Sequence, residues 1–302
     1  MSNFVVTGGA GFIGSKLAEY LKGQGHQVKV LDEFCPTWMS DSLKNKGIDL
    51  VLGSITSTDS LRIAFRDADG VFHLAAYSKM KKCAENPSIA YRINVGGTLN
   101  VLVTAVECGI KRVVYAASAQ AYGDNPRLPW KENARVRPLN PYAQTKYLGE
   151  VLCKEMAGAK FIETVRLRYF NVFGADRALA GMTDPPCIIE RFLRQKIEGK
   201  PIQIIGSGKQ RRDFIHVDDV IKATALAIEN KKISKGEIIN IGSGKNHSVV
   251  EIAELVGGTT ERLPGQKEEN DWLADISKAK KILGWEPKIS VEQWIKEQLA
   301  QL

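Results

Sequence analysis

The chain has 302 residues, of which 44% are hydrophobic and 25% are charged; this is ordinary for a soluble globular protein, and the length allows two domains. Its formal net charge of +8 suits an anionic ligand. Because the sequence has no dense block of Lys and Arg with interleaved aromatic residues, the composition argues against nucleic-acid binding and favours a mildly basic, solvated surface.

The first 170 residues alternate between short apolar runs and stretches with helical spacing. Strands are expected at Phe4–Thr7, Val28–Leu31, Leu50–Leu52, Val71–Leu74, Val113–Tyr115 and Thr164–Leu167. Helices are expected at Ile13–Lys22, Ser60–Arg66, Ala90–Cys108 and Tyr142–Ala157. This alternation predicts an α/β fold, a Rossmann-type doubly wound parallel sheet with helices on both faces.

After Phe170 the pattern becomes irregular, and Asp184-Pro185-Pro186 interrupts the chain. Helices are expected at Ile188–Glu198 and Asp218–Ile228, and strands at Ile202–Ile205 and Ile238–Ile241. A mixed pattern of this kind suits a smaller α/β C-terminal domain. We expect it to comprise residues 171–213 plus about 243–302, and the Rossmann domain to comprise 1–170 plus about 214–242.

The cysteines give no sign of a metal site or of a disulfide framework. The sequence has five, an odd number without metal-ligand spacing: Cys35, Cys83, Cys108, Cys153 and Cys187. We expect reduced thiols in a cytoplasmic protein without a metal. No apolar run reaches the ~18 residues that span a membrane, and no charged leader precedes the first strand, so no membrane association is expected.

A glycine-rich turn joins the first expected strand to the first expected helix. Gly8, Gly11 and Gly14 are spaced G-x-x-G-x-x-G, which permits a tight turn and close backbone approach to a pyrophosphate at a helix N-terminus. Asp32 ends the second expected strand, where its carboxylate can accept hydrogen bonds from the ribose 2′- and 3′-hydroxyls. Glu33 follows it, and a 2′-phosphate would meet two carboxylates there. The sequence therefore predicts NAD rather than NADP as the cofactor.

Tyr142 and Lys146 lie four residues apart and share one face of an expected helix, and Ser118 lies upstream of them. A free tyrosine titrates near pH 10, and lowering its pKa by about three units needs roughly 4 kcal/mol. A cation at ~4 Å supplies about 4 kcal/mol at an effective dielectric of ~20. We therefore expect the Lys146 ammonium to lower the pKa of Tyr142, so that this set removes a proton and a hydride from an alcohol.

Several further segments resemble the extended short-chain dehydrogenase/reductase family, in its nucleotide-sugar epimerase/dehydratase branch. They are Thr7–Ser15, His73-Leu74-Ala75-Ala76, Asn94–Thr98, Ser118–Gly123, Tyr142-x-x-x-Lys146, Arg168–Gly174, Arg212–Asp219, Arg262 before Pro264-Gly265, and Ala274–Lys280 with Leu283-Gly284-Trp285. The likeness covers nearly the whole chain. It implies an NAD-binding first domain, a nucleotide-sugar-binding second domain and a homodimer.

The resemblance also implies roles for individual residues. Catalysis would rest on Ser118, Tyr142 and Lys146. NAD would be contacted by Gly8, Gly11, Phe12, Ile13, Gly14, Asp32, Ser54, Ile55, Leu74, Ala75, Ala76, Asn94, Tyr142 and Lys146. The substrate would be contacted by Ser118, Tyr142, Asn171, Arg212 and Arg262, with the planar fork of each arginine gripping phosphate oxygens.

Three features depart from the family pattern. Ser54 stands where family members often carry the aspartate of the adenine pocket, and Gln266 stands where an acid usually follows Pro-Gly. The stretch Lys267–Leu273 is about two residues longer than is common. Because this stretch helps to shape the sugar pocket in the family, substrate identity is the part of the function that the resemblance defines least.

Two side chains after Ser118 separate the possible reactions. Sugar 4,6-dehydratases of the family usually carry Asp-Glu there, and decarboxylating relatives usually keep the glutamate. Here the positions hold Ala119 and Gln120, which do not titrate and so cannot do that acid–base work. What remains is enough to oxidise a 4-hydroxyl and reduce the ketone from the other face. This favours NAD-dependent 4-epimerisation of a UDP-hexose or UDP-N-acetylhexosamine, without excluding a uronate.

Two alternatives remain open on the same scaffold. One is a nucleotide-sugar dehydrogenase, reductase or unusual dehydratase. The other is a non-catalytic NAD-sensing protein, although such proteins usually lose the tyrosine or the lysine.

Overall fold

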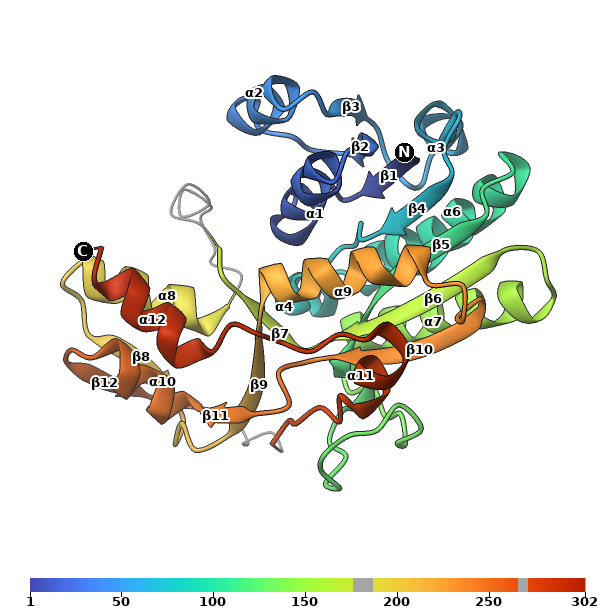
Figure 1. Cartoon of the computed structure of the whole chain (residues 1–302). Coiled ribbons are helices and arrows are strands. Elements are labelled where there is room, and N and C mark those ends of the chain that lie inside the picture. The colour runs from blue at the N-terminus through green and yellow to red at the C-terminus, as the bar shows by residue number, and fades with distance from the viewer. Residues whose placement is uncertain (176–186, 266–270, 302) are drawn as a thin grey trace. The chain divides into compact units, whose positions relative to one another are not determined.

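The computed structural model describes residues 1–175, 187–265 and 271–301 (Figure 1). These residues form two compact units. The first unit comprises Met1–Gly123, Pro138–Arg168 and Ile221–Ile239, and the second comprises the described parts of Asp124–Arg137, Tyr169–Val220 and Asn240–Leu302.

The strands are β1 (Asn3–Thr7), β2 (Gln27–Asp32), β3 (Asp49–Leu52), β4 (Gly70–His73), β5 (Arg112–Ser118), β6 (Glu163–Tyr169), β7 (Asn171–Phe173), β8 (Ile202–Ile205), β9 (Arg211–His216), β10 (Lys235–Ile241), β11 (Asn246–Ser248) and β12 (Thr260–Leu263). The α-helices are α1 (Phe12–Gly23), α2 (Thr37–Asn45), α3 (Thr58–Phe65), α4 (Met80–Glu85), α5 (Pro87–Tyr91), α6 (Gly97–Glu107), α7 (Pro141–Gly158), α8 (Ile188–Ile197), α9 (Val217–Glu229), α10 (Val249–Val256), α11 (Ser277–Leu283) and α12 (Val291–Leu299). A π-helical turn, η1 (Arg92–Gly96), and a 3₁₀ turn, η2 (Ala119–Tyr122), complete the described elements.

A seven-stranded sheet of order β10-β6-β5-β4-β1-β2-β3 confirms the predicted α/β class. Strand β1 pairs in parallel with both β2 and β4, so the chain leaves the centre of the sheet in opposite directions on its two sides. Such a reversal is the switch point at which doubly wound sheets bind their ligands, beyond the carboxyl ends of the strands. The glycine-rich turn begins at that end of β1.

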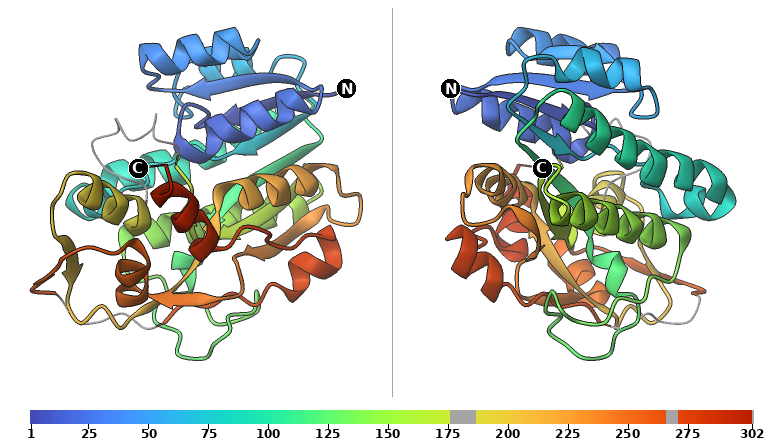
Figure 2. Two further views of the ribbon diagram at one scale, coloured as in Figure 1. Left: turned by 60° about the vertical axis from the view of Figure 1, so that its left-hand side comes forward. Right: turned by 90° about the vertical axis from the view of Figure 1, so that its right-hand side faces the viewer.

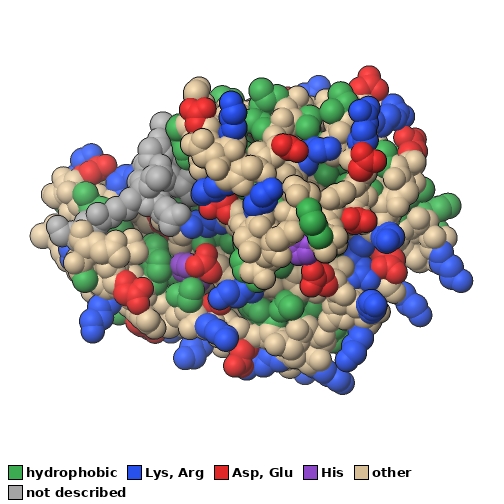
Figure 3. Space-filling view, turned by 45° about the horizontal axis from the view of Figure 1, so that its top comes forward, with side chains coloured by type: hydrophobic (Ala, Val, Ile, Leu, Met, Phe, Trp, Pro, Cys, Tyr) green, Lys and Arg blue, Asp and Glu red, His purple; other side chains and the backbone are tan. Residues whose placement is uncertain are grey.

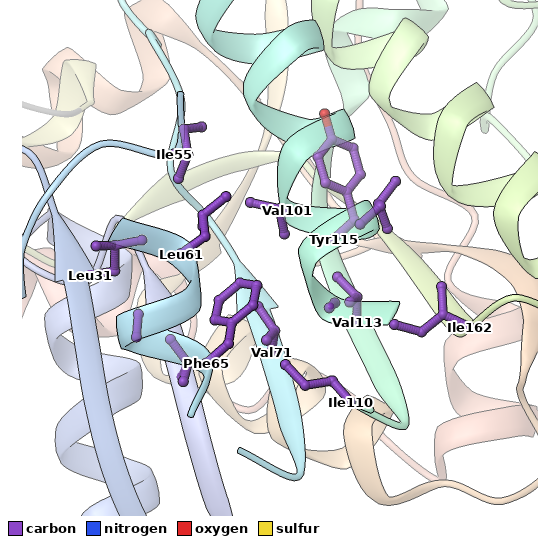
Figure 4. Packing of buried hydrophobic residues seen from close by; sticks show 14 of the residues in the cluster. Leu31, Ile55, Leu61, Phe65, Val71, Val101, Ile110, Val113, Tyr115 and Ile162 are labelled. Atoms are coloured by element: carbon purple, nitrogen blue, oxygen red, sulfur yellow. The ribbon is translucent and has the colours of Figure 1, made fainter. Parts of the chain in front are cut away.

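Helices α3, α6 and α7 lie side by side on one face of this sheet (Figure 2). The core beneath them joins side chains from β4, β5, α3 and α6, including Phe65, Val71, Val101 and Val113 (Figure 4). Tyr115 stands at the edge of this core with its hydroxyl group directed away from the aliphatic side chains. The core therefore joins β5, which ends at Ser118, to α7, which carries Tyr142 and Lys146.

The stretch from α5 to α6, Pro87–Glu107, is long and apolar enough on average to cross a membrane, although polar residues interrupt it. In its most apolar window, 44% of the residues are buried inside the protein. Val101, Leu102 and Ala105 belong to the core of the first unit. The stretch is therefore a partly buried core helix of the Rossmann-like unit.

The second unit contains a three-stranded sheet of order β11-β9-β7 and a parallel pair of β12 and β8. A separate core of side chains from α8, α10 and α12, among them Phe192, Ile252 and Ile295, holds this unit together. It is the smaller mixed α/β part that the irregular sequence pattern predicts after Phe170.

The unit boundaries differ from the expected domain boundaries most at two segments. Residues Asp124–Arg137 group with the second unit, because Trp130 bridges to Ala274 and its main-chain N–H donates to the Leu273 carbonyl at 2.8 Å. Residues Phe214–Val220 also group with it. Strand β9 continues through Phe214 and pairs with β7 and β11, so an expected boundary at residue 213 would cut a strand.

The basic composition does not produce a patch of one sign on the face in Figure 3, where Lys and Arg side chains are interspersed with Asp and Glu.

Candidate active site

The glycine-rich turn is packed too closely for side chains at two of its three glycines. Gly8 has a φ of +70°, and a Cβ there would lie 2.7 Å from the Ala75 Cα. A Cβ on Gly14 would lie 2.2 Å from the carbonyl oxygen of Gly8. The turn thus presses backbone against backbone at the start of α1, whose N-cap Gly11 has no side-chain cap. Phe12 and Ile13 form the first helical positions, so main-chain N–H groups face the region where a pyrophosphate would bind.

Asp32 ends β2 beside this turn. Its carboxylate accepts hydrogen bonds from the main-chain N–H groups of Ala10, at 3.0 Å, and Phe34, at 3.2 Å. Burial raises the pKa of Asp32, although these hydrogen bonds oppose the shift. Carboxylate oxygens have lone pairs for further donors, so this geometry fits recognition of a ribose diol.

Ser54 and Ile55 follow β3, next to Asp32. The Gly53 N–H donates to the Asp32 carbonyl at 2.9 Å, and the Ser54 hydroxyl bonds to Thr56 at 2.9 Å. Ile55 is 5% exposed and packs against Gly97, where a Cβ would lie 2.6 Å from its Cδ1 atom. The Ile55 side chain is therefore a core contact, and its expected contact with NAD stays a prediction.

Leu74, Ala75 and Ala76 leave the end of β4 on the other side of β1. The Leu74 N–H donates to the Thr7 carbonyl at 3.1 Å, and the Ala75 N–H donates to the Thr7 hydroxyl at 3.3 Å. These bonds hold Leu74 and Ala75 against the start of the glycine-rich turn, so residues expected to contact NAD after β1 and after β4 lie next to one another.

Local sequence determines where α7 begins and hence where its reactive side chains lie. Pro141 occupies the first turn, and the Asn140 side chain accepts the Ala143 N–H at 2.9 Å as the N-cap. Tyr142 then lies in the first turn and Lys146 lies one turn later. Ser118, at the end of β5, hydrogen-bonds to the Tyr142 side chain, and Lys146 follows one turn along α7.

Burial dominates the acidity of Tyr142. It raises the pKa to about 12, while the hydrogen bond from Ser118 lowers it in part. The Lys146 ammonium instead lies over the Tyr115 ring, 4.4 Å from its centroid. In the structure, the Ser118 hydroxyl favours the phenolate, and the effect expected of Lys146 on the Tyr142 pKa stays a prediction.

Lys146 sits in a buried pocket made by β5 and α7. Burial lowers the pKa of its ammonium group to about 8, while Cys153 and Glu150 act to raise it. The Tyr115 hydroxyl donates to the Lys146 carbonyl at 3.2 Å. A Cβ on Gly149 would lie 2.2 Å from that hydroxyl oxygen, so a glycine here lets the helix pass over Tyr115.

Asn94 lies in the π-helical turn η1 and is 1% exposed. Its Oδ1 accepts the Tyr77 N–H at 2.7 Å, and its Nδ2 donates to the Tyr77 carbonyl at 3.1 Å and to the Thr145 hydroxyl at 2.9 Å. The side chain therefore clamps the loop after β4 to α7, beside Lys146. A π-helical turn widens the helix locally and is frequent at functional sites.

Helix α4 adds neighbours that the sequence pattern does not indicate. The Gln120 side chain donates to the Met80 sulfur at 3.2 Å, and the Asn140 side chain lies 4.0 Å from the same sulfur. The charge of a Cys83 thiolate would raise the pKa of Tyr142 further, which places Cys83 beside it. Because Met80–Glu85 is short and rich in lysine, it lacks the apolar periodicity that predicts helices.

The expected phosphate-binding residues lie in the second unit. Asn171 and Arg212 stand on the paired strands β7 and β9, and the Asn171 side chain donates to the Asp213 carbonyl at 3.0 Å. The Arg212 guanidinium stacks on Trp272, 5.0 Å from a ring centroid. Arg262 lies on β12, in a different sheet, and donates to the Ser207 carbonyl at 2.6 Å.

Some expected features lie outside the described residues. These are Gln266, the first four residues of Lys267–Leu273, and Asp184-Pro185-Pro186. Within residues 1–175, 187–265 and 271–301, no group of three His, Cys, Asp or Glu side chains is placed to hold a metal ion.

Comparisons with known proteins place the chain in a family. Residues 4–242 match the model of the NAD dependent epimerase/dehydratase family. The chain is 35% identical to a UDP-glucuronate 4-epimerase of Thermodesulfobacterium geofontis, over 98% of this chain and 94% of that protein. It is 33% identical to a UDP-N-acetyl-alpha-D-glucosaminuronate decarboxylase of Bacillus cytotoxicus, over 97% and 95%. Its structure is similar to that of the UDP-glucose 4-epimerase of Thermotoga maritima with UDP-glucose, with a TM-score of 0.89 and 29% identity over 99% of both chains.

Proposed function

Because the chain belongs to the NAD dependent epimerase/dehydratase family, we propose that it is an NAD-dependent 4-epimerase of a UDP-sugar. The family shows that the chain is an enzyme with NAD as its cofactor and that its fold is that of the nucleotide-sugar epimerases. The 4-epimerase reaction and the hexose or N-acetylhexosamine substrate form the proposal.

One observation carries the choice of reaction. The hydrogen-bonded pair of Ser118 and Tyr142 is flanked by Ala119, which is fully buried, and by Gln120, whose amide is bonded to Met80. Neither neighbour can donate or accept a proton as an acid or a base. A dehydratase needs such a pair in addition to the tyrosine, whereas an epimerase does not.

The proton is handled by Tyr142 alone. In the oxidation, the Tyr142 phenolate takes the proton of the 4-hydroxyl as the hydrogen on C4 leaves with its electron pair, and a 4-ketone results. In the reduction, the same phenol returns its proton to the oxygen as a hydride reaches the opposite face of C4. Ser118 holds the reacting oxygen in both steps. The chemistry that NAD supplies when bound is reversible acceptance of that hydride.

Other residues hold the two reactants. Gly8, Gly11, Gly14 and Asp32 would bind the dinucleotide through the close backbone turn and the strand-end carboxylate. Asn171, Arg212 and Arg262 would bind the diphosphate of the substrate, and the sugar would then be free to turn after oxidation. We propose on this basis that the first unit binds NAD and the second binds the nucleotide.

The decarboxylase relative keeps a second reaction in view. Oxidation at C4 of a uronate also prepares loss of CO2, so the same first step serves both enzymes. In the family pattern, decarboxylating relatives usually keep the glutamate where this chain has Gln120. We therefore favour epimerisation over decarboxylation or net reduction.

A substrate panel tests the proposal. Purified protein is incubated separately with UDP-glucose, UDP-N-acetylglucosamine, UDP-glucuronate and dTDP-glucose, and the products are identified by NMR. We expect a UDP-hexose or UDP-N-acetylhexosamine to give its C4 epimer without added NADH, at the same final ratio from either side. A 4-keto-6-deoxy sugar, a pentose with release of CO2, or stoichiometric use of NADH would contradict epimerisation.

A further inference from the structure

A chain of buried polar side chains runs through the first unit from the glycine-rich turn to α7. Its central member is His73, which is fully buried at the end of β4. The His73 Nδ1 lies 2.8 Å from the Thr7 hydroxyl, and its Nε2 lies 2.9 Å from the Thr98 hydroxyl. A buried imidazole costs stability unless both nitrogens are bonded, and a leucine would fill the same space more cheaply. Packing alone therefore does not explain a histidine at position 73.

The hydrogen positions along this chain follow from the acceptors at its end. The Thr98 hydroxyl lies 2.6 Å from the Asn94 carbonyl, which can only accept, so the Thr98 hydrogen points there. Thr98 must then accept from His73, which places the imidazole hydrogen on Nε2. In a neutral ring Nδ1 is consequently an acceptor, and it receives the Thr7 hydrogen. The Thr7 oxygen in turn accepts the Ala75 N–H at 3.3 Å.

The main-chain carbonyl of Asn94 accepts the Thr98 hydrogen, and the side chain of the same residue connects to α7. Asn94 donates through Nδ2 to the Thr145 hydroxyl, and Thr145 donates to the main-chain carbonyl of Tyr142 at 2.8 Å. These hydrogen bonds thus begin at Thr7 and Ala75, beside the glycine-rich turn, and end at Tyr142, which acts on the sugar in the proposed reaction. Each hydroxyl donates once and accepts at least once, so an altered member disturbs its neighbours.

The surroundings of His73 favour its neutral form. Burial, and to a lesser extent the Lys146 ammonium on α7, lowers the pKa of His73 to about 3. The Tyr115 ring on β5 lies 5.5 Å from the imidazole, and the Tyr115 side chain is hydrogen-bonded to Thr98. A neutral ring with one defined hydrogen fixes the direction of hydrogen-bond donation from Thr7 through His73 to Thr98 across the pH range in which enzymes work.

We propose that His73, as the Nε2–H tautomer between Thr7 and Thr98, is a positioning residue that sets the glycine-rich turn and the catalytic helix at the distance needed for hydride transfer. The kcat test of this proposal rests on the proposed function, whereas the tests of the His73 tautomer and of NAD affinity do not. Hydride transfer requires the reacting atoms to be held about 3–3.5 Å apart, so a small displacement of either support lowers the rate constant.

The tautomer is tested first, in the unmodified protein. The sequence contains four histidines, so ¹⁵N-labelled histidine gives few signals, and replacing His26, His216 and His247 one at a time identifies the fourth. We expect His73 to show one protonated nitrogen, Nε2, from pH 5 to pH 8. Titration in this range, or a hydrogen on Nδ1, would overturn the proposal whatever reaction the enzyme catalyses.

Coupling is tested with Thr7→Val and Thr98→Val, which remove hydroxyls that lie on opposite sides of His73. Each single variant should lower kcat by about tenfold with little change in the KM for the sugar, and the double variant should fall little further. If the two single losses of kcat multiply in the double variant, these buried hydrogen bonds have only a structural role. The same follows if kcat of the NAD-loaded single variants stays within twofold of the unmodified value.

Two further variants separate positioning from general destabilisation. Thr98→Ser keeps the hydroxyl and should restore kcat. Thr104→Val removes a buried hydroxyl of the same helix, which has no partner among the described residues, and should leave kcat unchanged. NAD affinity, measured by titration calorimetry on NAD-stripped protein, should weaken about fivefold in Thr98→Val and not in Thr104→Val. Equal affinities would overturn the proposal even if no sugar is turned over.

Discussion

Tyr142 and Lys146 share a face of α7, and burial opposes ionisation of both. The pKa of Tyr142 is raised to about 12 and that of Lys146 is lowered to about 8, in each case chiefly because the charged form is desolvated. The residues therefore form a site in which ionisation is costly until opposite charges or donors are supplied. Ser118 supplies one such donor.

Tyr142→Phe tests the role of the phenol. The ring and its packing remain, but the proton carrier is lost, so turnover should fall by about 10²-fold or more. Retained NAD and thermal stability should stay near those of the unmodified protein, since the turn and Asp32 are untouched. Turnover within about threefold of the unmodified rate would remove Tyr142 from the mechanism.

Lys146 predicts a dependence of stability on pH. Its pKa is about 8 in the folded protein, against an ordinary value of 10.5 for a lysine in the unfolded chain, so between these values the unfolded chain binds a proton that the folded chain does not. The Lys146 contribution to stability therefore rises with pH across this window. In NAD-free protein, the unfolding free energy relative to Lys146→Met should increase by on the order of 2–3 kcal/mol from pH 7 to pH 10. Urea unfolding at both pH values measures it, and a constant difference would contradict the shift.

Arg212→Ala tests the proposed phosphate grip. An arginine that binds the diphosphate equally in ground and transition states contributes mainly to KM. Its loss should cost on the order of 2 kcal/mol and raise KM roughly thirtyfold, with retained NAD unchanged. Lys209→Ala, which removes an exposed cation from the preceding loop, is the control and should leave KM unchanged. An unaltered KM in Arg212→Ala would place the phosphates elsewhere.

At the scale of elements, α1 requires a glycine near its beginning but not at its end. A Cβ on Gly14 would collide with the Gly8 carbonyl, whereas a Cβ on Gly23, at the end of the same helix, would meet nothing within 4 Å. Gly14→Ala should therefore displace the turn and abolish NAD retention.

Gly23→Ala is the matched control for this prediction. It should retain NAD and gain up to about 1 kcal/mol of stability from the higher helix propensity of alanine. NAD released on denaturation, measured per chain, distinguishes the two variants. Equal NAD content in both would show that the close backbone approach at Gly14 does not shape the cofactor site.

At the scale of the whole molecule, α6 and α7 leave apolar side chains exposed next to one another in the first unit. Leu99 and Val103 on α6 are 43% and 41% exposed, and Leu148 on α7 is 37% exposed. Exposed apolar patches of this kind mark interaction surfaces. We propose that a second copy of the chain covers them, in the manner expected from the family resemblance.

Light scattering at micromolar concentration should give twice the monomer mass of 33.3 kDa. Val103→Glu should shift the mass toward the monomer, because a charge would be buried in the interface. Leu226→Glu, at an exposed leucine of α9, should not. A monomer mass for the unmodified protein would refute the dimer.

Local patterns determined much of the first unit. Apolar alternation predicted its sheet strands and main helices. The glycine-rich turn lies between β1 and α1, Asp32 ends β2, and Tyr142 and Lys146 lie near the start of α7, as the sequence predicts. Such features depend on residues close together in sequence, where steric and hydrogen-bonding rules act directly. The unit boundaries could not be predicted as well from the sequence, because β9 and Trp130 pair with segments that are distant in the sequence.

By itself, the sequence determined the fold class, the choice of NAD and the absence of an acid–base pair beside Ser118, because each follows from the identity of residues within one segment. Only the tertiary structure decided the environment of those residues. Thr7 and His73 are 66 positions apart, and Met80 and Gln120 are 40 positions apart. The two hydrogen bonds of the His73 imidazole, the placement of Lys146 over Tyr115 and the high pKa of Tyr142 arise from such distant contacts and from burial, which no local pattern encodes.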